Sequence, residues 1–182
     1  GVILSSPKGH DLSTFQKFIL VTLRLAIGWH FLSEGLGKLT AYPGWSAKGY
    51  LMGSYGPFSD LFHQIAQNQA MLSFSDLAVT YGLLLAGFCL LLGLFTRMGC
   101  IIGIVLLTMF YVSYPPWAFM PGVSTTTDSN YMIVNKNVIE CLGLLVVLSF
   151  PTGRFAGLDA LVYPMFGKNL PSWLVGNPSV EA

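Results

Sequence analysis

Residues 74–114 read FSDLAVTYGLLLAGFCLLLGLFTRMGCIIGIVLLTMFYVSY. The stretch holds two apolar runs, each near the roughly 20 residues that a helix needs to cross a bilayer. Only the turn at Thr96-Arg97 separates them, so we expect antiparallel helices over about 74–95 and 98–114. Ser73, Ser75 and Asp76 are residue types that cap helix starts, and Pro115-Pro116 ends the second run.

Two further apolar runs extend this pattern on either side, over about 15–39 and 131–150. In lipid every backbone N–H and C=O must be paired within the protein, so each run is expected to be a helix. The sequence therefore predicts an all-α fold. We expect one membrane domain, 1–182, an integral membrane four-helix bundle with a long aromatic-rich loop between its first two spans.

The composition agrees with a protein that lies in lipid. Hydrophobic residues make up 53% of the chain and charged residues 9%, against roughly a quarter in soluble domains. Nine Lys and Arg balance eight Asp and Glu, so the basic footprint of a nucleic-acid-binding domain is absent. The three cysteines show no metal-ligand spacing, and we expect no metal site.

The connection 40–72 and the segment that follows 114 are rich in aromatic residues with one polar edge, which favour the headgroup level of a membrane. We expect both to lie on one side of the bilayer as a shared interfacial cap. Its main aromatic members are Trp45, Tyr50, Phe58 and Trp117.

Lysine and arginine placement predicts the orientation. The positive-inside rule favours cytoplasmic amino and carboxyl ends, because that arrangement leaves only Lys48 in the opposite loops. The residues then on the cytoplasmic side are Lys8, Lys17, Arg97, Arg154 and Lys168.

Ionisable residues inside the spans are the main functional candidates, because charges are costly in hydrocarbon and usually pair or mark function. His30, Glu34 and Lys38 are spaced by four and share one helix face, and Lys136 and Glu140 are likewise spaced by four. Counting depth from the shared rim predicts two contacts, Glu34 with Lys136 and His30 with Glu140. These residues could fix helix register, or they could relay protons or bind a polar ligand head.

Three motifs carry a resemblance to a known family. Residues 23–39, LRLAIGWHFLSEGLGKL, resemble the opening motif of the DoxX family of four-span membrane proteins. The turn Gly93-Leu-Phe-Thr-Arg97 is the second match, and Gly153-Arg-Phe-Ala-Gly-Leu-Asp-Ala-Leu161 is similar to the closing motif. Residues 45–51 and 56–58 further resemble the DoxD branch, the membrane subunit of thiosulfate:quinone oxidoreductase.

The resemblance implies a multi-pass protein of the bacterial or archaeal cytoplasmic membrane that is associated with quinone or sulfur redox chemistry and with partner subunits. It implies no catalytic set. Arg24, Arg154 and Asp159 match family positions and are expected as structural ion pairs, with Arg154 and Asp159 close at the cytoplasmic rim.

No nucleophile elbow or phosphate-binding glycine loop is present in the sequence. We therefore expect an accessory or anchoring component of a larger membrane complex, with the bilayer and other subunits as partners. One alternative is a quinone-binding subunit that acts directly in thiosulfate or sulfur oxidation. No cofactor is firmly predicted, and quinone is the one that this alternative would bind. A second alternative is a small transporter.

Overall fold

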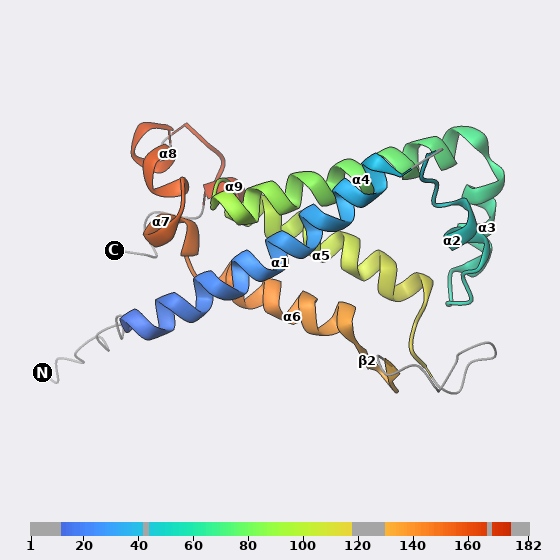
Figure 1. The fold of residues 1–182 in the computed structure, drawn as a ribbon, viewed down its shortest axis with the longest axis horizontal. Coiled ribbons are helices and arrows are strands. Elements are labelled where there is room, and N and C mark those ends of the chain that lie inside the picture. Colours follow the sequence, from blue (N-terminus) through green and yellow to red (C-terminus); the bar gives the residue numbers. More distant parts are fainter. Residues whose placement is uncertain (1–11, 42–43, 118–129, 167–168, 176–182) are drawn as a thin grey trace, which may run out of the picture.

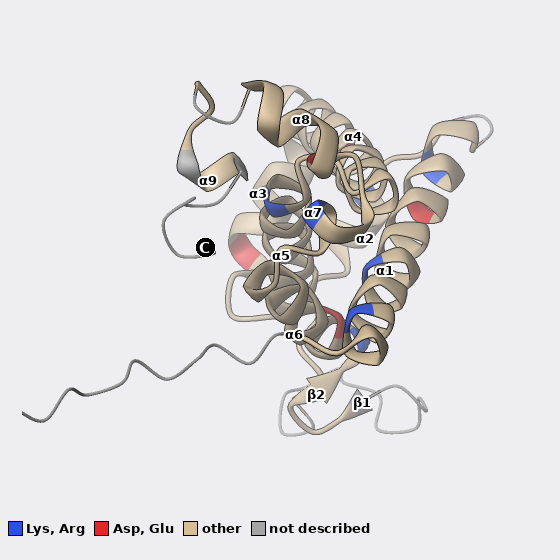
Figure 2. Cartoon of the chain, turned by 90° about the vertical axis from the view of Figure 1, so that its left-hand side faces the viewer, with Lys and Arg blue, Asp and Glu red and all other residues tan. Residues whose placement is uncertain are grey.

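The computed structural model describes residues 12–41, 44–117, 130–166 and 169–175, and these are mostly helical. Three helices are long and apolar enough to cross a membrane: α1 (Thr14–Thr40), α4 (Gln69–Leu92) and α5 (Thr96–Ser113). Figure 1 shows them crossing one another along the length of the molecule. Figure 2 shows several charged positions along α1, whereas α4 carries only Asp76 and α5 only Arg97. The predicted spans at 15–39, 74–95 and 98–114 correspond to these three helices.

The start of α1 is fixed by a reciprocal cap. Ser13 Oγ accepts a hydrogen bond from Gln16 N at 3.2 Å, and Gln16 Oε1 accepts one from Ser13 N at 2.8 Å. This capping box satisfies two backbone donors at the end of a helix that is otherwise mostly apolar.

Helix α4 begins earlier than predicted. Its N-cap is Asn68, whose Oδ1 accepts from Ala70 N and Met71 N, so residues 69–73 are helical rather than loop. Asp76, which was expected to cap the helix, instead accepts from Ala47 N at 2.6 Å. Asp76 thus holds the chain that precedes α2, and Asn68, which was not among the expected capping residues, caps the helix.

The turn between α4 and α5 is tight, as expected. Gly93 adopts the left-handed conformation, with φ 62°, and Phe95 does so with φ 50°. Glycine tolerates this geometry without strain, whereas a phenylalanine does not.

The fourth predicted span is wrong in its first part. Residues Asn130–Tyr131 (β1) and Val134–Asn135 (β2) form an antiparallel hairpin, and α6 covers Lys136–Ser149. Asn135 caps α6 by accepting from Val138 N. Fourteen residues span about 21 Å, less than the roughly 30 Å hydrocarbon core. Helix α6 packs against α1 and α5, but it falls short of the length of a spanning helix, and four spans are not established.

The chain between α1 and α4 folds into two short helices, α2 (Lys48–Met52) and α3 (Ser59–Gln67). They lie together at one end of the molecule, on the right in Figure 1, which we call the α2–α3 end. Apolar side chains hold them there in a small core of their own: Ala47, Leu51, Phe62, Ala66 and Leu72.

At the opposite end lie the short helices α7 (Thr152–Ala156), α8 (Asp159–Phe166) and α9 (Ser172–Val175), together with the start of α1. We call this the α7–α9 end. Lys8 and Lys168, which entered the predicted orientation, lie outside the described residues.

Close glycine contacts join α1 to α4. A Cβ on Gly87 would stand 2.6 Å from Leu32 N, and one on Gly35 would stand 2.8 Å from Leu84 Cγ. The absence of side chains at these positions lets the two backbones approach closely. Gly37 differs, because a Cβ there would meet nothing within 4 Å.

Candidate functional site

A cavity of about 580 Å³ lies at the α2–α3 end, between α1, α4 and α5 and beneath the two short helices. Its volume is in the range that small-molecule sites occupy, roughly 300–1,000 Å³. We call it the aromatic cavity. Its walls are formed by His30, Phe31, Glu34, Lys38, Trp45, Ala47, Tyr50, Leu51, Tyr55, Phe62, Ile65, Ser75, Val79, Leu83, Leu107, Met109, Phe110, Ser113, Tyr114, Asn135, Lys136 and Asn137.

Three tyrosines form much of the aromatic wall. The ring centroids of Tyr50 and Tyr114 are 4.5 Å apart, and the Tyr55 and Tyr114 rings meet edge to face at 5.2 Å. Tyr114 Oη donates to Tyr50 O at 2.6 Å, and Tyr50 Oη donates to Phe110 O at 3.3 Å. Although 40% of Tyr50 is exposed, the burial of its hydroxyl end raises its pKa, so the phenol stays protonated.

The opposite wall is polar and comes from one face of α1. Glu34 Oε2 lies 3.0 Å from Lys38 Nζ, and Glu34 Oε1 lies 4.0 Å from His30 Nε2. The Lys38 ammonium also lies 4.9 Å from the centre of the Trp45 ring, a cation–π distance. His30, Glu34 and Lys38 therefore form one continuous row along the cavity.

Glu140 extends this row behind the cavity wall. His30 Nδ1 lies 2.6 Å from Glu140 Oε1 on α6, with the two side chains 34% and 20% exposed. The oxygen lies away from the ring N–H direction, so the contact is an ion-pair distance rather than an aligned hydrogen bond. Glu140 Oε2 is buried and has no hydrogen-bond partner among the described residues. Depth counting placed His30 and Glu140 at one level, and the structure brings them together.

The other expected contact takes a different form. Glu34 pairs with Lys38, one turn away on the same helix, and Lys136 from the start of α6 lines the same cavity. Lys136 is close enough to interact electrostatically with Glu34, but no direct ion pair joins them within the described part of the chain. An i,i+4 neighbour reaches the carboxylate more easily than a residue on another helix.

The four aromatic residues expected at the membrane interface divide into two groups. Trp45 and Tyr50 line the aromatic cavity, whereas Phe58 is 54% exposed and Trp117 Nε1 donates to Tyr111 Oη at 3.0 Å. Sequence reasoning missed Tyr55 and Tyr114 as wall residues. The many aromatic residues in the segments after 39 and after 114 were visible in the sequence. The folding of α2 and α3 back over the long helices, which turns these residues into a cavity wall, was not.

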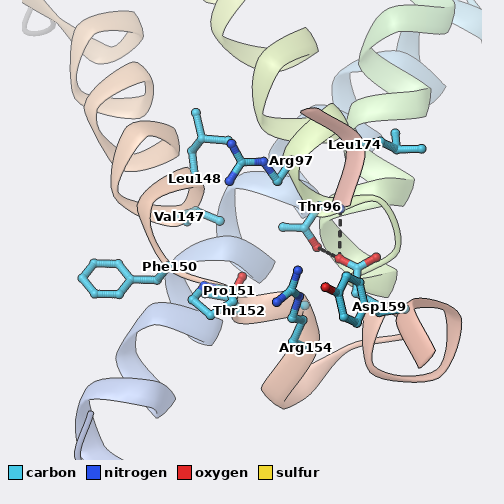
Figure 3. A pocket seen from close by; sticks show the side chains of 12 residues that line it. Thr96, Arg97, Val147, Leu148, Phe150, Pro151, Thr152, Arg154, Asp159 and Leu174 are labelled. Atoms are coloured by element: carbon cyan, nitrogen blue, oxygen red, sulfur yellow. Dashed lines mark hydrogen bonds between the residues drawn. The ribbon is translucent and has the colours of Figure 1, made fainter. Parts of the chain in front are cut away.

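The residues expected as structural ion pairs gather at the α7–α9 end. Asp159 Oδ1 accepts from Phe95 N at 2.6 Å, and Oδ2 accepts from Thr96 N at 3.2 Å and from Thr96 Oγ1 at 2.7 Å. Figure 3 shows this carboxylate against the start of α5. The Arg154 guanidinium lies 3.9 Å from the centre of the Tyr163 ring.

Arg24 joins the same region from α1. It is 2% exposed, and its Nη2 donates to Ala156 O at 2.6 Å. Asp159 is close enough to interact with it electrostatically. The backbones of Gly93 and Gly157 also touch, and Asp159 N donates to Gly93 O at 2.8 Å. Three sequence motifs that lie far apart thus form one structural unit.

The DoxX family model matches residues 19–114, from α1 to the end of α5. Comparison with curated proteins and with solved structures finds no match. The closing motif at 153–161 lies beyond the matched residues, and its resemblance stays a prediction.

Proposed function

The chain belongs to the DoxX family of membrane proteins, and from that membership and the geometry of the aromatic cavity we propose that it is the quinone-binding subunit of a membrane redox complex. The observation that carries the proposal is a cavity of about 580 Å³ that is lined both by aromatic rings and by a row of ionisable side chains, His30, Glu34 and Lys38.

The aromatic and the ionisable side chains of the cavity suit the two parts of a quinone head, its flat ring and its carbonyl oxygens. A flat ring packs well against the rings of Trp45, Tyr50 and Tyr55, since offset and edge-to-face contacts are favourable. The quinone carbonyl oxygens are acceptors, and the ammonium groups of Lys38 and Lys136 donate hydrogen bonds to acceptors. The Glu34 and His30 side chains that line the cavity are also partly exposed, 46% and 34% respectively.

Reduction of a quinone to a quinol takes up two electrons and two protons, one proton at each carbonyl oxygen. Histidine suits proton transfer because its ring nitrogens can both hold and release a proton. His30 would supply one of these protons and would be reprotonated through Glu140 on one side or through Glu34 on the other, and the second proton would come from solvent. The electrons come from a redox centre on a partner subunit.

The resemblance to the DoxD branch supports a reduced sulfur compound, such as thiosulfate, as the source of those electrons. It also supports the cytoplasmic membrane of a bacterium or archaeon as the location. In this arrangement the chain is also an accessory component that anchors its partner, because the apolar surfaces of α1, α4 and α5 hold it in the bilayer.

The test is binding of a short-chain quinone to the full chain in lipid nanodiscs, measured by calorimetry. Val79 lines the cavity, whereas Val105 on α5 is 56% exposed and faces outward. Val79→Trp fills the cavity and is expected to weaken binding at least tenfold, and the matched control Val105→Trp is expected to bind as the parent does. Thermal midpoints establish that both variants fold. A purely anchoring role predicts no saturable binding by the parent chain.

A further inference from the structure

A second, smaller pocket lies at the α7–α9 end, between the start of α5, the end of α6 and α7 (Figure 3). We call it the Thr152 pocket. Its volume is about 30 Å³, and a site needs roughly 10–15 Å³ to hold one water-sized group. The pocket therefore has room for a few oxygen atoms. Its polar lining consists of Thr96, Arg97, Thr152, Arg154, Asp159 and Tyr163.

Two hydrogen-bonding groups in this lining lack partners. Thr152 is fully buried, and its Oγ1 has no hydrogen-bond partner among the described residues. The Nε of Arg97 is also buried and unpartnered within the same part of the chain. Leaving buried polar groups unpaired costs free energy, so native structures nearly always satisfy them. Both groups are hydrogen-bond donors, and both residues line the Thr152 pocket.

Asp159 does not supply the missing acceptor. Its Oδ1 already accepts from Phe95 N, and its Oδ2 accepts twice from Thr96. The negative charge of Asp159 is offset by Arg24, which is close enough to interact with it electrostatically. Arg97 and Arg154 bring guanidinium groups to the pocket from two different elements. A group with several anionic oxygens fits this set of donors.

We propose that the Thr152 pocket binds a phosphate group. Guanidinium groups match the geometry of phosphate oxygens, and a threonine hydroxyl adds a further donor. The phosphate could belong to an acidic phospholipid, because the pocket lies at the ends of helices long enough to cross a membrane, where headgroups gather. It could also belong to a soluble phosphate compound. The site is independent of the aromatic cavity at the other end of the bundle.

Two arms of one experiment separate these sources. The full chain is placed in nanodiscs of phosphatidylcholine, and its thermal midpoint is measured with inorganic phosphate against chloride at equal ionic strength. The second arm replaces part of the phosphatidylcholine with phosphatidylglycerol and adds no phosphate. A ligand that binds only the folded state raises the midpoint, here by roughly 3 °C or more in at least one arm. A response to phosphatidylglycerol alone assigns a lipid headgroup, and a response to inorganic phosphate assigns a soluble compound.

Two variants locate the effect. Thr152→Val keeps the shape of the side chain and removes a hydroxyl that has no partner in the protein, so it is expected to fold as the parent does and to lose at least half of the response. Arg97→Gln is expected to abolish it. Lys48→Gln, an exposed lysine at the α2–α3 end, is the control and keeps the full response. No response in either arm, or a full response in both pocket variants, overturns the proposal.

Discussion

His30 Nδ1 on α1 lies 2.6 Å from Glu140 Oε1 on α6, so two ionisable side chains meet between helices of a mostly apolar bundle. The pair lies directly behind the polar wall of the aromatic cavity, and His30 belongs to both. The same contact, made between α1 and α6, connects the cavity to the partly buried carboxylate of Glu140.

The His30–Glu140 contact is expected to couple the two residues energetically. His30→Gln, Glu140→Gln and the double variant form a double-mutant cycle, measured by chemical unfolding in mild detergent. Residues in contact show coupling of roughly 0.5–3 kcal/mol, and partial exposure of His30 places the value in the lower part of that range. Additive effects within error would show that the contact contributes nothing.

The partner of Glu34 is expected to be Lys38 rather than Lys136. Glu34→Lys places like charges one turn apart and lowers the thermal midpoint. The exchange Glu34→Lys with Lys38→Glu is expected to restore most of the loss, because it recreates the pair in reverse. Glu34→Lys with Lys136→Glu serves as the comparison. Better rescue by the Lys136 exchange would argue for an interhelical pair and against the observed geometry.

Two glycines are expected to respond in opposite directions to one methyl group. Gly87→Ala brings a Cβ against the backbone of Leu32 and is expected to destabilise the fold by about 1–3 kcal/mol. Gly37→Ala meets open space in a helix and is expected to stabilise by about 0.4–1 kcal/mol. Denaturant unfolding of both variants measures the difference. Equal changes would contradict the close approach of α1 and α4.

The cap on α5 is expected to depend on the charge of Asp159. Asp159→Asn replaces a carboxylate that accepts three hydrogen bonds with an amide that has one acceptor oxygen. The expected loss is about 1.5–3 kcal/mol, the value of hydrogen bonds to charged groups. The control is Asp60→Asn on the exposed side of α3. Similar thermal unfolding midpoints for both variants would show that the Asp159 carboxylate does not stabilise the start of α5.

Much of the fold was readable from hydropathy. Three apolar runs predicted α1, α4 and α5, because in lipid a run of that length has few alternatives to a helix. The hairpin at Gly93 followed from the absence of a loop. The prediction of a helix over 131–135 is wrong because Tyr131 and Val134 are as apolar in a strand as in a helix, and Met132 and Ile133 in the turn between the strands are apolar too, so periodicity does not separate the two over so short a stretch.

The candidate site was readable only in its polar half. Spacing by four placed His30, Glu34 and Lys38 on one face, and depth counting brought Glu140 to His30. The aromatic half depends on how α2 and α3 fold back over the helices. The hydrogen bonds Asp76 to Ala47 and Tyr114 to Tyr50 fix that arrangement, and no local pattern predicts contacts between segments so far apart.

The central claim is that a quinone ring occupies the aromatic cavity, and photolabelling tests it most directly. The full chain in nanodiscs is irradiated with an azido-quinone, with and without excess unlabelled quinone, and labelled positions are mapped by mass spectrometry. The account predicts competable labels on residues of the cavity walls, such as Trp45, Tyr50 and Val79. Labels confined to outward-facing positions such as Val105 and Trp29, unaffected by competitor, would contradict it.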